Sequence, residues 1–131
     1  MIASGCGAWV AEEVQGPAPV NDMALLMNAV RRDFPEHSDL FRIPFFPFNG
    51  VIYRRSDGDI MYPGLRYRGI QNVVIEADKT GYIRASHYNI VASASHAGQR
   101  IVVVVMGAPS AAVRRAAFAR LIESGFAALG V

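Results

Sequence analysis

One position in the chain stands apart by residue type. Lys79, in the stretch Lys79-Thr80-Gly81, is the only lysine, although the chain carries twelve arginines. Lysine is a compact point charge whose pKa responds to its surroundings, whereas arginine is charged at every ordinary pH. A single lysine among arginines is therefore the first candidate for a specific chemical role. Taken alone, it could equally be a surface residue in a turn at a strand edge.

The other residues with chemical potential form no pattern of their own. Three histidines (His37, His87 and His96) lack the spacing of metal ligands or of a catalytic triad, so we expect no metal. Cys6 is the only cysteine, which excludes an internal disulfide. No histidine lies near Cys6 in the sequence, and a small buried apolar residue is the commoner role for a free cysteine.

The composition is that of a folded domain or part of one. The chain has 131 residues, of which 52% are hydrophobic and 18% charged, enough to bury a core. The net charge of +2 indicates no particular partner. No apolar run is long enough to span a membrane. Small residues precede Cys6, but neither a basic nor an apolar region does, so we expect no signal peptide.

Three segments are predicted to be helical. The first covers residues 4–14, with Ser4 as N-cap. The second runs from Asp22 to about Arg32 and ends at the following Phe-Pro pair. The third starts after the N-cap Ser110 and ends near Ser124, with the next glycine, Gly125, as C-cap. Arg114 falls on the apolar side of this last helix, where we expect it to bridge the helix and the sheet.

The strands are predicted mainly in the second half. Residues 73–83 and 87–95 show strand patterns, and residues 100–106 contain an unbroken apolar run that is typical of a strand at the centre of a sheet. Earlier, residues 51–54 and 59–62 could form a hairpin around Ser56-Asp57-Gly58. The predicted fold is α/β, with a sheet packed beneath an amphipathic C-terminal helix.

The ordered series of motifs after Lys79 resembles a known enzyme family. "KTGYIRASHYNIVASASHAGQRIVVVVMGAPSAAVRR" is similar to the C-terminal third of the serine-type D-alanyl-D-alanine carboxypeptidases, which are low-molecular-mass penicillin-binding proteins. The features that match are Lys79-Thr80-Gly81, Asn89 to Ala94, Gly107 to Ser110, and Arg114. Upstream, residues 21–50 resemble the segment that ends the helical region of that family.

This resemblance implies a partial domain over residues 1–131. The expected architecture is an antiparallel sheet layered by helices (αβα), of which the last three strands are present. Residues 73–128 would form the sheet and the C-terminal helix, and residues 21–50 the end of the helical region. The family carries three motifs in chain order: Ser-x-x-Lys, Ser-x-Asn and Lys-Thr-Gly. Residues 1–16 would be a remnant of the helix that carries the second motif.

The resemblance also implies roles for the family's third motif, which is Lys79-Thr80-Gly81 in this chain. Lys79 would place positive charge near the terminal carboxylate of a peptidoglycan stem peptide, and Thr80 would hydrogen-bond to it. Gly81 would permit close approach of a peptide lying along the strand edge. The backbone N–H of Tyr82 would be one oxyanion-hole donor. Stem peptides and β-lactams are the implied partners, no cofactor is implied, and the implied location is periplasmic or extracytoplasmic.

The family's nucleophile motif, Ser-x-x-Lys, is absent from the chain. The residue three positions before Lys79 is Glu76, and there is no other lysine. The second motif could survive at Ser4, with Cys6 in place of asparagine, or Ser4 could be only an N-cap. We therefore expect this chain alone to form no acyl-enzyme and to be inactive as a carboxypeptidase.

A different function class remains open for residues 53–68. Four arginines lie there among three tyrosines: Arg54, Arg55, Arg66 and Arg68 with Tyr53, Tyr62 and Tyr67. Cations interleaved with aromatic rings can bind single-stranded nucleic acid, and an anionic cell-wall polymer would be attracted to the same patch. We favour a solvated hairpin and expect no nucleic-acid partner, because the net charge is small and no nucleic-acid motif is present.

Loss of the first family strand has a structural consequence. That strand normally pairs with the last, so its absence would uncover one edge of residues 100–106. We expect one of three outcomes: poor solubility, self-association through that edge, or a substitute strand from residues 43–62.

Overall fold

A computed structural model describes residues 2–4, 7–13, 20–43, 45–54 and 72–131, with the backbone alone for residues 2–13, Arg42 and Arg54. Its elements in chain order are β1 (Ile2–Ser4), β2 (Gly7–Glu13), α1 (Val20–Asp33), the 3₁₀ helix η1 (Pro35–Arg42), β3 (Phe45–Phe48), β4 (Val51–Arg54), β5 (Val74–Ile83), β6 (His87–His96), β7 (Gln99–Ala108) and α2 (Ala111–Ala128). No helix in these ranges is long and apolar enough to cross a membrane.

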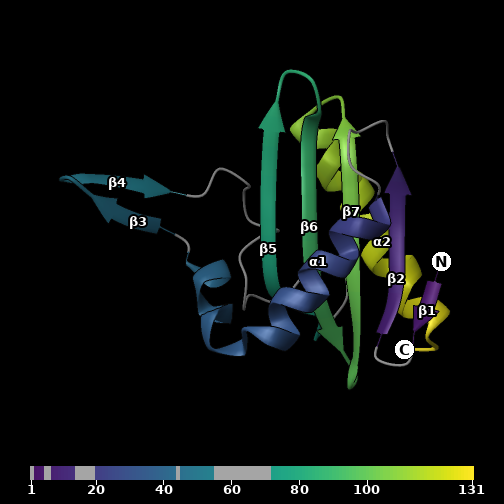
Figure 1. Cartoon of the computed structure of the whole chain (residues 1–131). Coiled ribbons are helices and arrows are strands. Elements are labelled where there is room, and N and C mark those ends of the chain that lie inside the picture. Colours follow the sequence, from purple (N-terminus) through teal and green to yellow (C-terminus); the bar gives the residue numbers. More distant parts are fainter. Residues whose placement is uncertain (1, 5–6, 14–19, 44, 55–71) are drawn as a thin grey trace.

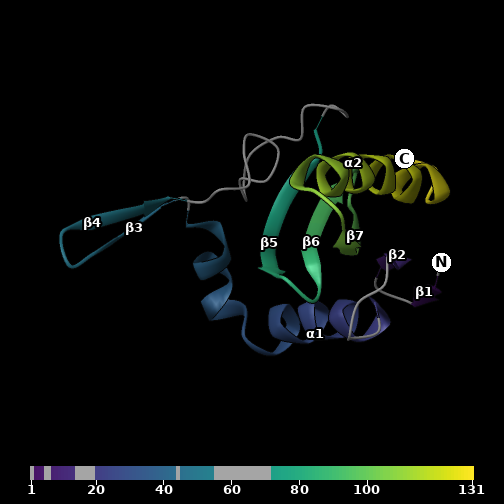
Figure 2. The same cartoon turned by 90° about the horizontal axis from the view of Figure 1, so that it is seen from above.

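The main sheet has five strands in the order β1-β2-β7-β6-β5, and β7 lies at its centre (Figure 1). Seen from above, α1 lies on one face of the sheet and α2 on the other (Figure 2). The predicted helix–sheet–helix layering is therefore confirmed. The last three strands form antiparallel pairs, as expected, and their bounds agree closely with the predicted ones.

The N-terminal segment corrects two predictions. Residues 2–4 and 7–13 form strands β1 and β2 where a helix over residues 4–14 was expected. β2 runs parallel to β7, from the pair Ala8–Ile101 to the pair Glu13–Met106. Without β2, the backbone N–H and C=O groups along this edge of β7 would be unpaired. Hydrogen bonding to them stabilises a strand more than the weak local helix propensity of these residues stabilises a helix. The substitute strand thus comes from residues 7–13, not 43–62, and the edge on which self-association was predicted is already paired.

The two faces of the sheet bury separate apolar clusters. On the α2 face the helix contributes Ala117, Phe118, Leu121, Ile122 and Phe126, which pack on residues of β5, β6 and β7. On the α1 face the helix contributes Val20, Ala24 and Met27, which pack on Ala77, Val91, Val102, Val104 and Met106. Strand residues alternate between the two clusters, as side chains of a sheet buried on both faces must.

The ends of α2 show one prediction confirmed and one wrong. Ser110 is the N-cap, since its hydroxyl accepts a hydrogen bond from the backbone N–H of Val113 at 3.1 Å. Gly125 was predicted to end the helix, but it is buried within it. The next residue, Phe126, is fully buried against the sheet, and its packing carries the helix on to Ala128. Gly130, with φ of 75°, supplies the left-handed turn instead.

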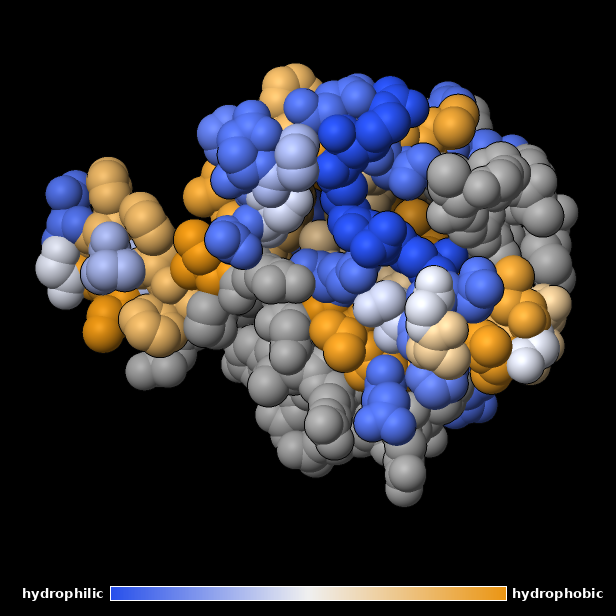
Figure 3. All heavy atoms as spheres, turned by 90° about the horizontal axis from the view of Figure 1, so that it is seen from below, coloured by the Kyte–Doolittle hydropathy of each residue, from blue (hydrophilic) through white to orange (hydrophobic). Residues whose placement is uncertain are grey.

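Strands β3 and β4 form a hairpin that projects from the main body (Figure 1). β4 was predicted as a hairpin strand, and among the described residues its partner is β3. Residues 59–62, the partner that was predicted, lie outside the described residues. The turn is Asn49-Gly50, whose φ values of 48° and 75° suit a two-residue type I′ turn. Its exposed large apolar side chains are Phe45, Phe46, Phe48, Val51, Ile52 and Tyr53. Figure 3 shows these apolar residues on a surface that stands away from the body.

Candidate functional site

A β-bulge in β5 determines which face of the sheet the Lys79 side chain joins. Ile75 pairs with Ala94 and Ala77 pairs with Ser93, so Glu76 is one extra residue between two adjacent pairs. A one-residue shift moves every following side chain to the other face. Accordingly, Ile75 packs in the α2-side cluster and Ala77 in the α1-side cluster. Lys79, two residues beyond Ala77, therefore belongs to the α1 side.

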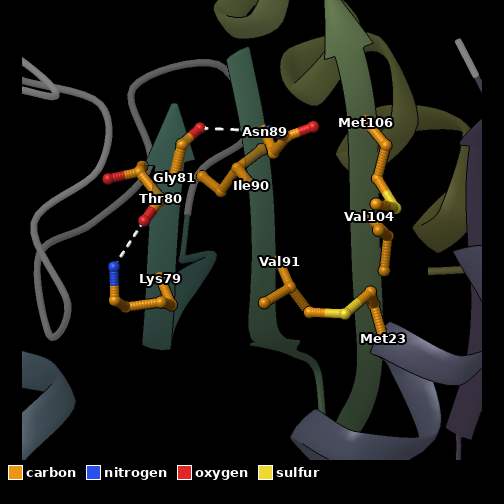
Figure 4. A pocket seen from close by; sticks show the side chains of 9 residues that line it. All are labelled: Met23, Lys79, Thr80, Gly81, Asn89, Ile90, Val91, Val104 and Met106. Atoms are coloured by element: carbon orange, nitrogen blue, oxygen red, sulfur yellow. Dashed lines mark hydrogen bonds between the residues drawn. The ribbon is translucent and has the colours of Figure 1, made fainter. Parts of the chain in front are cut away.

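The triplet Lys79-Thr80-Gly81 lies on β5 at the outer edge of the sheet (Figure 4). The Lys79 ammonium is exposed and donates to the backbone carbonyl of Thr80. The Thr80 side chain points away from β6 and β7 in Figure 4. A side chain added at Gly81 would meet no atom within 4 Å, so space is open above this residue.

The backbone of β5 faces alternately inward and outward. The Gly81 carbonyl accepts a 3.3 Å hydrogen bond from the Asn89 side chain on β6, its paired residue. Residues on either side of an inward-facing residue direct their N–H and C=O groups to the opposite edge. The backbone groups of Thr80 and Tyr82 thus face the outer edge of β5. Within the described ranges, no further strand pairs with that edge.

Asn89 ties three neighbouring segments together. Its side-chain oxygen accepts from the Gly107 N–H at 2.9 Å, and its amide donates to the Ser86 hydroxyl at 3.0 Å and the His87 carbonyl at 2.9 Å. Gly107 has φ of 74° and lies where the register between β6 and β7 shifts by one residue. A glycine in the left-handed region is typical of such a bulge. Asn89 thereby satisfies a backbone N–H that the shifted ladder leaves without a strand partner.

An apolar hollow of about 200 Å³ adjoins the triplet. Its floor is formed by β6 and β7, and Met23 reaches it from α1 (Figure 4). The residues that line it are Met23, Lys79, Thr80, Gly81, Asn89, Ile90, Val91, Val104 and Met106. The hollow combines one ammonium and one side-chain amide with flexible apolar side chains. Such a site can hold a ligand that has an anionic end and a small apolar body.

A polar cluster surrounds Glu76 between α1 and the sheet. The Glu76 carboxylate forms ion pairs with Arg31 of α1 at 2.8 Å and with Arg100 of β7 at 2.8 Å. The buried Ser93 hydroxyl of β6 donates to the same carboxylate at 3.2 Å. Burial by itself would raise the pKa of Glu76, but the hydrogen bond from Arg100 and the charges of Arg31 and Arg100 outweigh it, so the pKa lies below its ordinary value.

Arg114 links α2 to the sheet, as predicted. It is buried, and its guanidinium donates to the Asn89 carbonyl at 3.5 Å. It also lies over the Tyr88 ring, 5.9 Å from its centre, and Tyr88 in turn packs against Tyr82 with ring centres 4.6 Å apart. This chain of contacts connects the outer edge of β5 to the C-terminal helix.

Other predicted site residues are not brought into this hollow by anything the structure describes. Ser4 ends β1, on the far side of the sheet from β5, and only its backbone is described. Cys6 lies outside the described residues. So do Arg55, Arg66 and Arg68, and the prediction of an anionic-polymer site there stays a prediction. Among the described residues, no group of three His, Cys, Asp or Glu side chains could hold a metal ion.

Two contributors to the site were missed by sequence reasoning. Glu76 was noted only as the residue that is not the nucleophilic serine, although an acidic residue within an apolar strand signals a partner across the sheet. Met23 falls within the segment from Asp22 to about Arg32 that was predicted to be helical. Nothing in its spacing indicates that it reaches the Lys79 strand.

The sequence of this chain is similar to those of known carboxypeptidases. A family profile described as D-alanyl-D-alanine carboxypeptidase matches residues 16–110. The D-alanyl-D-alanine carboxypeptidase DacA of Escherichia coli K12 is 32% identical over 105 residues, which are 80% of this chain and 24% of that protein. DacA of Haemophilus influenzae is 30% identical over 107 residues. The chain thus spans about a quarter of the length of these curated relatives.

Solved structures agree with the sequence comparison. Penicillin-binding protein 5 from Haemophilus influenzae superposes with a TM-score of 0.69 and 28% identity, over 82% of this chain and 29% of that one. Penicillin-binding protein D2 from Listeria monocytogenes, solved with bound cefotaxime, gives a TM-score of 0.59 at 24% identity, over 78% of this chain and 38% of that one. The second likeness concerns the fold alone.

Proposed function

This chain belongs to the D-alanyl-D-alanine carboxypeptidase family, and from that premise we propose that it is the substrate-holding part of such a site. In this proposal the Lys79–Tyr82 edge binds the D-alanyl-D-alanine end of a peptidoglycan stem peptide, or a β-lactam, without cleaving it. Its place of action would then be outside the cytoplasm, where peptidoglycan lies.

The outer edge of β5 is the observation that carries the proposal. The backbone groups of Thr80 and Tyr82 face that edge, so an extended peptide could add to the sheet as a further strand. The Lys79 ammonium lies beside it and would attract a terminal carboxylate. The apolar hollow next to Gly81 has room for the methyl groups of two alanines.

The lack of hydrolysis is proposed from the sequence. Acyl transfer needs an activated nucleophile, and in this family it is the serine of Ser-x-x-Lys. Glu76 occupies the position three residues before Lys79, and its carboxylate is held by two arginines. A carboxylate held in that way is not available as an attacking group. Without the family nucleophile, binding would be reversible.

The test is binding and covalent labelling of the same purified chain. We expect a D-alanyl-D-alanine peptide and a penicillin to bind reversibly by calorimetry, and intact-mass spectrometry to show no adduct. Lys79→Gln should abolish the binding, whereas Arg84→Gln, an exposed cation at the next turn, should retain it. A mass increase of one β-lactam would show that the chain forms an acyl-enzyme and would overturn the proposal that it lacks a nucleophile. Ser4→Ala and Cys6→Ala would then identify the nucleophile.

A further inference from the structure

The bulged residue of β5 is also the centre of the polar cluster that joins α1 to the sheet. We propose that Glu76 is a positioning residue: its ion pairs with Arg31 and Arg100 hold the bulge in place, and the bulge directs Lys79 and Gly81 toward the ligand hollow. The ligand part of this inference rests on the proposed function above. The structural part does not.

The contacts of Glu76 come from three other elements of the fold. Arg100 of β7 donates from Nε to Oε2 at 2.8 Å and from Nη2 to Oε1 at 3.1 Å. Arg31 of α1 approaches Oε2 at 2.8 Å and also donates to the Ser93 hydroxyl at 2.6 Å. Ser93 completes the cluster from β6. Both carboxylate oxygens are therefore engaged by the bidentate guanidinium of Arg100, and Oε2 is also engaged by Arg31 and Ser93.

The geometry connects this cluster to the site through side-chain alternation. Ser93 is the partner of Ala77, the first residue after the bulge, so its hydrogen bond to Glu76 spans the irregular step of the ladder. If the bulge moved or closed, the residues beyond it would exchange faces. Lys79 and Gly81 would then leave the side on which Met23 and Met106 line the hollow.

The environment of the Arg31–Glu76 pair separates it from an ordinary surface ion pair, whereas the Arg100 side chain is 47% exposed. The side chains of Arg31 and Glu76 are 17% and 14% exposed. The chain offers a matched contrast in Arg32 and Asp33, which are neighbours in sequence and 70% and 46% exposed. Exposed pairs contribute little, whereas a pair that is shielded from water and joins distant elements constrains their relative position.

Hydrogen exchange on the whole chain tests the structural part. In Glu76→Gln, which keeps the size and removes the charge, we expect the exchange of those amides in residues 77–83 that face β6 to rise at least tenfold while α2 is unchanged. Glu76→Asp, which keeps the charge, should restore most of the protection, and Asp33→Asn should change nothing. Unchanged exchange in residues 77–83 of Glu76→Gln, or an equal rise in every element, would overturn the proposal.

Binding of a D-alanyl-D-alanine peptide tests the ligand part in the same variants. We expect Glu76→Gln to raise the Kd about tenfold under conditions where circular dichroism shows full folding, and Glu76→Asp to recover most of the loss. An unchanged Kd in Glu76→Gln would overturn the link to the site. If the unaltered chain binds no peptide, the proposed function fails, and hydrogen exchange still decides whether Glu76 holds the bulge.

Discussion

The two faces of the sheet differ in what covers them and in what they can do. On the α2 face, large fully buried side chains such as Phe118, Ile122 and Phe126 fill the space between helix and sheet. On the α1 face the helix contributes three smaller contacts, and the remaining area holds the Glu76 cluster and the apolar hollow beside Lys79. Under the proposed function, the main packing core and the binding site lie on opposite faces of the same strands.

The largest expected loss of stability comes from a cavity on the α2 face. We expect Phe118→Ala to lower the free energy of unfolding by about 3–5 kcal/mol, because a fully buried ring leaves an unfilled space. Urea denaturation measures this directly. A loss below 1 kcal/mol would mean that the α2 face is not the main source of stability. Val113→Ala, on the exposed side of the same helix, is the control.

The equivalent change on the α1 face should have a smaller effect. Met27→Ala is expected to cost about 2 kcal/mol, near the lower limit for buried methionine, because α1 packs on the sheet through few side chains. Leu25→Ala, at an exposed position of α1, should leave stability within about 0.5 kcal/mol. If Met27→Ala were as costly as Phe118→Ala, the two faces would be equivalent in packing.

The Glu76 cluster gives the α1 face a dependence on pH. Because the pKa of Glu76 is lowered in the folded chain, its stabilisation is complete above its ordinary value of 4.5 and is lost as pH falls through the lower folded value. We expect stability to decline below pH 4.5 in the unaltered chain and to decline less in Glu76→Gln. At pH 7 this substitution should cost about 1.5 kcal/mol, as for a hydrogen bond to a charged group.

Asp33 is the control for that titration, because the pKa of its carboxyl is also lowered, by the hydrogen bond from Arg32, but the Arg32–Asp33 pair lies at the surface. The measurement is the urea midpoint from pH 7 to pH 3 for Glu76→Gln, Asp33→Asn and the unaltered chain. Equal pH profiles for Glu76→Gln and the unaltered chain would show that Glu76 does not carry the dependence.

Substitution of Lys79 is expected to have the smallest effect on stability, and it best separates the site from the framework. Lys79 is exposed and its ammonium contacts only the neighbouring carbonyl among the described interactions, so Lys79→Gln should change the free energy of unfolding by less than about 0.5 kcal/mol. The same variant is expected to lose peptide binding. A large loss of stability would mean that Lys79 is part of the framework and not of the site.

Much of the fold was predictable from local patterns. The apolar run of β7, the alternation of β6 and the N-cap Ser110 each act through neighbouring residues, and each prediction was confirmed. β2 was not predictable in this way, because a strand over residues 7–13 becomes favourable only when the edge of β7 is present to pair with it. The Asn49-Gly50 turn was a readable hairpin signal that the prediction passed over.

For the candidate site too, local features were predictable and features set by distant contacts were not. The motif residues 79–81 could be identified from spacing and resemblance. Their orientation depends on the bulge at Glu76, and a bulge is set by contacts with Arg31 and Arg100, which are distant in sequence. The Asn89 side chain, which bonds the bulge at Gly107, is likewise settled only in three dimensions.

The parallel pairing of β2 with β7 has a consequence for the order of folding. Residues 8–13 meet residues 101–106, so this ladder closes a loop of roughly 90 residues, whereas β5, β6 and β7 are joined by tight turns. Distant pairings generally form late. We expect β5–β7 and α2 to assemble first and β2 to dock in a slower phase, visible in stopped-flow fluorescence of Trp9. During that interval the apolar edge of β7 is open, so aggregation should depend on refolding concentration and not on storage of the native chain.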